Sequence, residues 1–569
     1  MRRLMMCLAA GAFIAAGAGV AAAQETVTVN GAEATRVVIA PPDSPVAEII
    51  KQRLSADYYG AVPTSRAYAD AQKLYFFYGA RHFEPIWLAK QADGSESFSP
   101  NALKLIDVFK NAASEGFNPS DYLTPALDVS AAGTDPQKLA NLETAFSESA
   151  IRYAHDAYMG RIAPEDVSNA IDPETKDLDA ADVLTQLASS GDPAQVMASL
   201  DPPGHEFQAL KAALARYNEA DQATPIIIPP GPTLKPGMKD KRLALLRQRL
   251  NVAAPVLADG QADTYDDDLV SAVTDFQSNA GLTADGIVGP ATLGALNNVG
   301  GKISREDIIA NMERWRWLPH DLGDFHVLVN IPEFRVAIIE NDQTVFSTRV
   351  VVGKPATPTP LFSNSIKNIV VNPYWNVPAS IVAKEVAPDM LRNPGYIDSQ
   401  NMEIVSGAHV IDASAIDWGN VTQGNWHYTL RQLPGRGNAL GQIKFLFPNP
   451  HDVYLHDTPS KSLFANAVRA YSHGCVRVQN PMDFANALLK YEPGLDVGML
   501  ESMFGSRERW VNLKTHVPVH IAYFTIRADA DGNLHSYADI YGHNKRLIDM
   551  LEGKAGAVAH SNTPIVAGV

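Results

Sequence analysis

Residues 456–478 read HDTPSKSLFANAVRAYSHGCVRV and place one cysteine, Cys475, between a glycine and a short β-forming run. Gly474 permits a tight turn and close approach of another backbone. Val476 and Val478 alternate with Arg477, as residues do on a strand. We therefore expect the thiol at a turn-to-strand junction, where the backbone N–H groups of Gly474 and Cys475 can stabilise an oxyanion.

A histidine ends a second β-rich run, at His456 in VYLHDTP. We predict that this strand pairs with the one after Cys475, which brings the imidazole beside the sulfur. A thiol is mostly protonated at neutral pH, and a neighbouring histidine is the usual means of activating it. We therefore expect a solvent-accessible Cys475 with a lowered pKa. A buried structural thiol is one alternative. A zinc site made by His456, His473 and Cys475 is another, although no fourth ligand follows at regular spacing.

This stretch resembles the active-site signature of the L,D-transpeptidases with a YkuD-type catalytic domain. The shared pattern is a histidine, fifteen residues (457–471), Ser-His-Gly-Cys and then Val-Arg. The segments NMERWRWLP, TPTPLFSNSIKNIVVNPYWNVP and RQLPGRGNALGQIKFLFPN also resemble the large multi-domain periplasmic members. SEGFNPSDY and YMGRIAP resemble their helical scaffold domain, and FQSNAGLTADGIVGPATLGAL resembles a small peptidoglycan-binding module.

The resemblance implies acyl transfer in peptidoglycan, and thus a role in cell-wall organisation and cell shape, with no cofactor and no metal. Cys475 would attack the carbonyl between diaminopimelate and the terminal D-Ala of a tetrapeptide stem, giving a thioester. The amine of a second stem would then resolve it into a 3→3 cross-link, and a carbapenem would act as an inhibitor. His456 would be the base, and His473 and Gly474 would shape the oxyanion pocket. The candidate substrate-binding residues are Arg477, Ser472, Tyr454 and Trp426. Arg477 either orients the turn or contacts a substrate carboxylate.

A long insertion, about 379–441, interrupts the strand pattern and contains Trp426. It is longer than ordinary connections, which indicates a functional cover. A lid-like subdomain at this place would exclude water, because a thioester must meet an amine before it is hydrolysed. The alternative is a plain surface insertion.

Three other functions stay open. Without a cover the acyl-enzyme would hydrolyse, and the protein would be a cell-wall cysteine carboxypeptidase or cross-link hydrolase. The acceptor could instead be an envelope protein that becomes attached to peptidoglycan. A non-catalytic wall-binding protein is favoured by the modular N-terminal half, but the intact Cys–His signature argues against it.

The N-terminus has the features of a cleaved signal peptide. Arg2 and Arg3 precede an apolar run, and Ala21-Ala22-Ala23 supplies small residues before Gln24. This predicts export to the periplasm. Cys7 would then be removed, leaving Cys475 as the only thiol of the mature chain.

The whole pattern predicts a multi-domain α+β protein. Local helix signals include Ser99 as a cap before Pro100, and a hairpin signal stands at Asn341-Asp342. The predicted parts are a signal peptide (1–23), a helical scaffold-like domain (44–223), a Pro-rich linker (224–237), a three-helix peptidoglycan-binding-like module (238–300), a mainly-β catalytic domain (301–552) and a flexible tail (553–569).

Composition sets the limits of these predictions. The chain has 569 residues, a formal charge of −16, 46 % hydrophobic and 19 % charged residues, as a globular protein does. The acidic balance argues against nucleic acid as a partner. Two cysteines are too few for a disulfide framework. After the N-terminus, no apolar run reaches the roughly 18–20 residues of a membrane span. The expected partners are peptidoglycan stem peptides.

Overall fold

The computed structural model describes residues 24–29, 32–37, 39–60, 66–92, 95–174, 176–217, 226–258, 262–279, 282–297 and 303–556. The predicted signal peptide and residues 557–569 of the predicted tail lie outside these ranges. The chain forms two compact units, the first of which comprises residues 1–113, 117–154 and 177–198 and the second the remainder. The helical region predicted as one domain over 44–223 is therefore divided between the two units.

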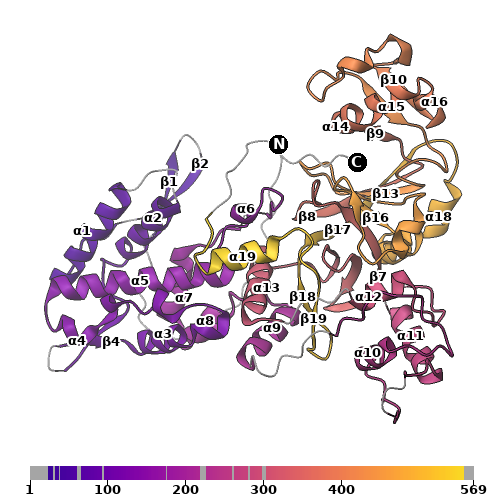
Figure 1. Ribbon diagram of the computed structural model, residues 1–569. Helices are drawn as coiled ribbons and strands as arrows, with labels where there is room; N and C mark the ends of the chain where they lie inside the picture. Colours follow the sequence, from indigo (N-terminus) through magenta and orange to yellow (C-terminus); the bar gives the residue numbers. More distant parts are fainter. Residues whose placement is uncertain are drawn as a thin grey trace. The chain divides into compact units, whose positions relative to one another are not determined.

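The first unit is mainly helical (Figure 1). Its elements are α1 (Pro45–Gly60), α2 (Arg66–Gly79), α3 (Pro100–Lys110), most of α5 (Pro136–Met159), α7 (Ala180–Ser189), α8 (Pro193–Ala198) and the hairpins β1–β2 (Gln24–Val29, Ala32–Val37) and β3–β4 (Leu88–Lys90, Glu96–Phe98). The predicted cap of α3 is confirmed, because Ser99 Oγ accepts the N–H of Ala102 at 3.3 Å. The two hairpins are absent from the sequence prediction.

The aromatic residues near position 80 are part of the core of the first unit. Tyr78, Phe83 and Trp87 are fully buried. They surround the carboxylate of Glu143, which accepts hydrogen bonds from Tyr78 OH at 2.6 Å and the Ile86 N–H at 2.7 Å. Burial raises the pKa of Glu143 to about 7.

The second unit is organised by a nine-stranded sheet in the order β15-β7-β16-β14-β13-β8-β17-β5-β6. β6 also pairs with β7, so the strands from β7 to β6 close into a ring. A large hydrophobic core includes residues of these strands and of α17 (Pro481–Leu488). The strands are β5 (Phe325–Asn330), β6 (Arg335–Glu340), β7 (Gln343–Gly353), β8 (Phe362–Val371), β13 (Ile443–Leu446), β14 (Leu455–His456), β15 (Ala470–Ser472), β16 (Val476–Val478) and β17 (Arg509–Ala522).

Local sequence explains most of the strand boundaries. Asn341 and Asp342 adopt φ values of 48° and 62°, which confirms the predicted hairpin between β6 and β7. The run before it forms two strands, since Phe334 also has a positive φ, 56°, and turns the chain between β5 and β6. Near the C-terminus the short strand β19 (Leu534–Ser536) pairs with β18 (Ile526–Ala528).

The predicted three-helix module is present as α10 (Arg242–Leu250), α11 (Asp267–Asn279) and α12 (Pro290–Asn297), which share a small core. The Pro-rich segment before it is more than a linker, because Ile228 and Leu234 are fully buried in that core. Leu234 exchanges backbone hydrogen bonds with Val288 at 3.1 and 3.0 Å. The expectation of a separate linker over 224–237 is therefore corrected: its apolar residues complete the module.

The insertion between β8 and β13 is a folded subdomain with its own sheet, in the order β11-β10-β12-β9 (Figure 1). Its strands are β9 (Trp375–Val377), β10 (Met402–Ser406), β11 (His409–Ile411) and β12 (Thr429–Gln432). The helices α14 (Ala379–Ile381), α15 (Ala387–Arg392) and α16 (Tyr396–Ser399) accompany them. The subdomain has a separate hydrophobic core around Val382, Ile404 and Leu430. We call residues 375–441 the lid.

Other helices of the second unit are α6 (Pro164–Val167), α9 (His205–Ala215), α13 (Arg305–Trp317), α18 (Val497–Ser502) and α19 (His543–Leu551). A capping box at Ser304 and Asp307 starts α13. None of the helices in the described ranges has both the length and the apolar character needed to span a bilayer.

Candidate active site

The side chain of Ser472 stabilises the turn that carries Cys475 through two hydrogen bonds to its backbone. Ser472 Oγ donates to the Cys475 carbonyl at 2.6 Å and accepts the Gly474 N–H at 3.1 Å. Gly474 has φ of 127°, a conformation that favours glycine. Ser472, predicted as a substrate-binding candidate, therefore holds the backbone that presents the thiol.

A second set of hydrogen bonds fixes this turn from outside. Thr359 Oγ1 donates to the Gly474 carbonyl at 2.7 Å and accepts the Gly353 N–H at 2.9 Å. Tyr541 OH donates to the Gly353 carbonyl at 2.6 Å. Sequence reasoning quoted the TPTP run that contains Thr359 but gave this residue no role, because its partner lies more than a hundred positions away.

His456 lies beside the cysteine strand, as predicted. β14 and β16 pair in parallel, with Leu455 opposite Val476 and His456 opposite Arg477. The His456 Nδ1 atom contacts the carbonyl oxygen of Asp457. A carbonyl only accepts, so Nδ1 carries the hydrogen and Nε2 keeps a free electron pair.

Burial and the positive charge of Arg477 lower the pKa of His456 to about 3. The imidazole is 2 % exposed, so water does not solvate its cation. His456 is thus a neutral base with a defined tautomer throughout the physiological pH range.

The expectation of an accessible thiol with a lowered pKa is wrong for this closed structure. Cys475 is 1 % exposed, and burial raises its pKa to about 12. The Tyr454 backbone N–H and the charges of Arg477 and Lys444 act in the opposite direction but are the smaller effects. The sulfur is therefore a thiol here, and it needs a base to become a nucleophile.

Cys475 and His456 line one cavity of about 140 Å³ together with Ser472, His473 and Arg477. Its other five residues, Trp375, Ile381, Glu385, Ala439 and Leu440, all come from the lid. The structure thus brings together five of the eight residues singled out from the sequence, with Gly474 inside the same turn.

Two predicted aromatic residues lie elsewhere. The Tyr454 ring packs edge-on against His456, with centroids 5.7 Å apart, but is outside the cavity lining. Trp426 packs on Trp418 in the lid, with centroids 5.8 Å apart. The lid aromatic that reaches the cavity is Trp375, which sequence reasoning quoted within PYWNVP but did not single out.

The lid contacts the signature directly through a carboxylate. Glu385 Oε1 lies 2.7 Å from His473 Nε2, and Lys354 Nζ lies 3.2 Å from the same nitrogen. Glu385 belongs to a π-helical turn, Val382–Val386, a rare geometry often found at functional sites. His473 therefore connects the lid to the cysteine turn.

The predicted oxyanion donors are only partly free. The Gly474 N–H is engaged by Ser472 Oγ, so the candidate donors are the N–H groups of His473 and Cys475. In the described residues, no three His, Cys, Asp or Glu side chains form a group suited to a metal ion.

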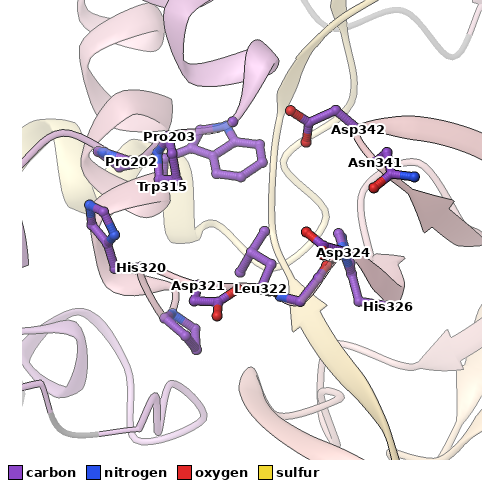
Figure 2. Close-up of a pocket in the computed structure, with 13 residues that line it drawn as sticks. Pro202, Pro203, Trp315, His320, Asp321, Leu322, Asp324, His326, Asn341 and Asp342 are labelled. Atoms are coloured by element: carbon purple, nitrogen blue, oxygen red, sulfur yellow. Dashed lines mark hydrogen bonds between the residues drawn. The ribbon is translucent and has the colours of Figure 1, made fainter. Parts of the chain in front are cut away.

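A larger cavity of about 320 Å³ lies elsewhere in the second unit. Figure 2 shows Trp315, Asp324 and Asp342 among the side chains around it. Its lining contains none of the residues predicted for the site.

Family models match three parts of the chain. Residues 324–518 match "L,D-transpeptidase catalytic domain", residues 239–296 match "Putative peptidoglycan binding domain", and residues 72–214 match "Scaffold domain". The chain is therefore modular, and the cavity with Cys475 and His456 lies in the segment that matches the catalytic-domain model. The chain carries a YkuD-type L,D-transpeptidase catalytic domain, a peptidoglycan-binding domain and a scaffold domain.

Individual relatives are more distant. A Haemophilus influenzae protein named "Putative L,D-transpeptidase" is 32 % identical over 246 residues, covering 42 % of this chain and 49 % of the relative. The chain thus matches about half the length of that curated relative. Solved L,D-transpeptidases from Xylanimonas cellulosilytica and Stackebrandtia nassauensis are 16 % and 14 % identical, with TM-scores of 0.16 and 0.20. They cover 52 % and 48 % of this chain, and 99 % and 88 % of their own.

Proposed function

We propose that this protein is an L,D-transpeptidase that forms 3→3 cross-links between diaminopimelate residues of peptidoglycan stems. The observation that carries the proposal is the pairing of a buried thiol with a neutral, buried imidazole in one small cavity beneath a lid. The catalytic-domain match over 324–518 supports the reaction class.

The first half-reaction begins with proton transfer from Cys475 to His456 Nε2 as the sulfur attacks the diaminopimelate carbonyl. The N–H groups of His473 and Cys475 stabilise the oxyanion. The C–N bond to D-Ala breaks, and the imidazolium returns its proton to the departing amine. A thioester on Cys475 remains.

In the second half-reaction the side-chain amine of another stem attacks the thioester, and His456 takes its proton. The C–S bond breaks and the protonated imidazole restores the thiol. Because burial raises the pKa of Cys475 to about 12, the sulfur is protonated before substrate binds, and the cycle requires His456 to take the proton during the attack.

Transfer rather than hydrolysis is supported by the cover that the lid gives to the cavity. Lid residues form part of its wall, and Glu385 holds the lid against His473. Excluding water protects the thioester until an amine arrives. A hydrolase and an enzyme that attaches envelope proteins are the alternatives, and they differ from the proposed function in the acceptor alone. The predicted signal peptide, residues 1–23, supports a periplasmic location.

Purified protein incubated with disaccharide-tetrapeptide tests the function directly. We expect released D-Ala and a dimer whose fragmentation joins two diaminopimelate residues. We also expect a carbapenem to add covalently to Cys475. Conversion of tetrapeptide to tripeptide alone, with no dimer at any substrate concentration, would show that the enzyme is a hydrolase.

We predict that Glu385→Gln raises the ratio of hydrolysis to transfer severalfold, because it weakens the charge-assisted contact that holds the lid to His473. The ratio of tripeptide to dimer measures the effect. Glu403→Gln is the matched control, since Glu403 pairs with Arg431 inside the lid. If the ratio of tripeptide to dimer is the same in Glu385→Gln and Glu403→Gln, the contact between Glu385 and His473 has no role in excluding water.

A fragment of residues 226–300 should fold and pellet with purified sacculi, whereas one beginning at Met238 should be markedly less stable. The shorter fragment lacks Ile228 and Leu234, each worth about 1.5–3 kcal/mol when buried. Thermal unfolding and co-sedimentation measure the two effects. If the longer fragment pellets no better than an inert protein, the module is a spacer.

A further inference from the structure

We propose that Lys444 and Arg477 form a carboxylate-binding subsite on either side of His456, which recognises the free carboxylate of the donor peptide. This deepens the proposed function and rests on it. Arg477 was a candidate from the sequence, but Lys444 and the pairing of the two cations come from the structure.

Strand register places the two cations around the histidine. Lys444 on β13 is directly opposite His456 on β14, and His456 is directly opposite Arg477 on β16. Directly paired residues project from the same face of a sheet, and adjacent strands lie about 4.8 Å apart. The three side chains therefore form one row across three strands, with the base at its centre.

Both cations are largely removed from water. Lys444 is 9 % exposed, and Arg477 is partly buried in the wall of the cavity. The Arg477 Nε atom is buried without a hydrogen-bond partner. Charged side chains are seldom buried without an opposite charge or a full set of hydrogen bonds.

Among the residues that the structure describes, none supplies a carboxylate that pairs with either cation. No ion pair or side-chain hydrogen bond joins Lys444 or Arg477 to another described residue. Elsewhere in the second unit, Arg247 binds Asp263 at 2.6 Å and the half-buried Arg527 binds Glu206 and Glu333. The buried Arg349 and Arg469 have no carboxylate partner and donate to backbone carbonyls instead. Lys444 and Arg477 have neither kind of partner among the described residues.

Neighbouring groups compensate only part of the charge on Lys444. Its ammonium lies 5.4 Å from the Tyr454 ring centroid and 5.8 Å from that of Trp510, within reach of cation–π attraction. Glu508 attracts Lys444 from a distance. Its carboxylate accepts the Tyr374 N–H and the Trp510 indole N–H, both at 2.9 Å, instead of pairing with the ammonium.

The chemistry of the donor fits this arrangement. A peptide that loses its last residue carries a free carboxylate one residue beyond the bond that breaks. A guanidinium offers a planar pair of donors to such a group, and an ammonium adds a second charge. Held between them, the carboxylate would place the preceding carbonyl at the sulfur and exclude stems extended by further residues.

The alternative role for the two cations is to stabilise the Cys475 thiolate alone, since both charges act on the sulfur. Alkylation of Cys475 in the full chain separates the roles, because it requires no transpeptidation. We compare the rates for iodoacetate and iodoacetamide, which differ in a carboxylate, by mass analysis of the Cys475 peptide. The variants are Lys444→Met and Arg477→Met, and the control is Lys490→Met, a lysine that pairs with Glu340.

We expect the rate ratio of iodoacetate to iodoacetamide to fall roughly tenfold in each site variant, the discrimination typical of one lost hydrogen bond to a charged group. The control should keep the wild-type ratio. An unchanged ratio, whether the two rates fall together or stay the same, would overturn the subsite. That outcome would leave the proposed function intact if dimers still form.

A measurement on the unaltered chain covers the case in which a variant does not fold. N-acetyl-D-alanine should slow the reaction of Cys475 with iodoacetamide, and N-acetyl-D-alaninamide should not. Equal protection by both compounds would overturn the proposal, because the amide has the same shape without the charge.

Discussion

Replacing Cys475 by alanine is expected to lower D-Ala release by at least about 10⁴-fold, as loss of the nucleophile does in other acyl-transfer enzymes. The reason is that the only thiol in the described chain lines the cavity beside His456. The protein should still fold, with a stability loss of about 1 kcal/mol from the missing sulfur atom in a buried turn. Release of D-Ala and thermal unfolding are the two measurements.

Cys475→Ser is the matched variant because it keeps the size and shape of the side chain. A serine hydroxyl is a much weaker nucleophile than a thiol beside the same base, so it should form no acyl-enzyme. Intact-mass spectra after carbapenem treatment should show an adduct on wild type alone. Dimer formation by either variant would contradict the assignment of Cys475 as the nucleophile.

The second large effect is expected for His456→Gln, which should lower kcat about 10²–10⁴-fold and change KM much less. Glutamine can still donate to the Asp457 carbonyl but offers no basic nitrogen to the thiol. Since its pKa is lowered to about 3, wild-type His456 stays deprotonated, and thus basic, down to well below pH 5. Wild-type activity should therefore show no acid limb near pH 6.5 from this residue.

The control for that prediction is His535→Gln, an exposed histidine paired with Asp529 at 2.9 Å in the β18–β19 hairpin. It should keep the wild-type kcat and pH profile. An acid limb near pH 6.5 that disappears in His456→Gln would mean that the site is more open to water in solution than its 2 % exposure indicates.

The sequence was sufficient to predict that Cys475 and His456 lie in one cavity, because both residues belong to one short segment with a strong local pattern. The alternation of Val476 and Val478 predicted strand β16, and the run VYLH predicted strand β14. The pairing of β14 with β16 was therefore predicted from two local patterns. The three-helix module and the Ser99 cap were predicted from equally local sequence patterns.

What sequence reasoning missed depends on contacts between distant segments. Thr359, Trp375 and Lys444 reach the site only because β7, the lid and β13 converge there in space. The cavity beside Cys475 has the same origin, since lid residues form part of its wall. Trp426 and Trp375 both pack against the lid core, and only the folded lid shows that Trp375 also lines the cavity.

The way in which the lid joins the sheet has a consequence for how such catalysts can be varied. Val371, at the end of β8, is directly paired with Ile443, at the start of β13, and the Asn372 N–H donates to the Gln442 carbonyl at 2.8 Å. The lid therefore occupies the place of the turn between two paired strands, β8 and β13. Its hydrophobic core is made of its own residues. An insertion of different size and chemistry can therefore replace the lid between β8 and β13 while the ring of strands stays unchanged. If the proposed function holds, replacement of this one insertion would change acceptor choice independently of Cys475 and His456.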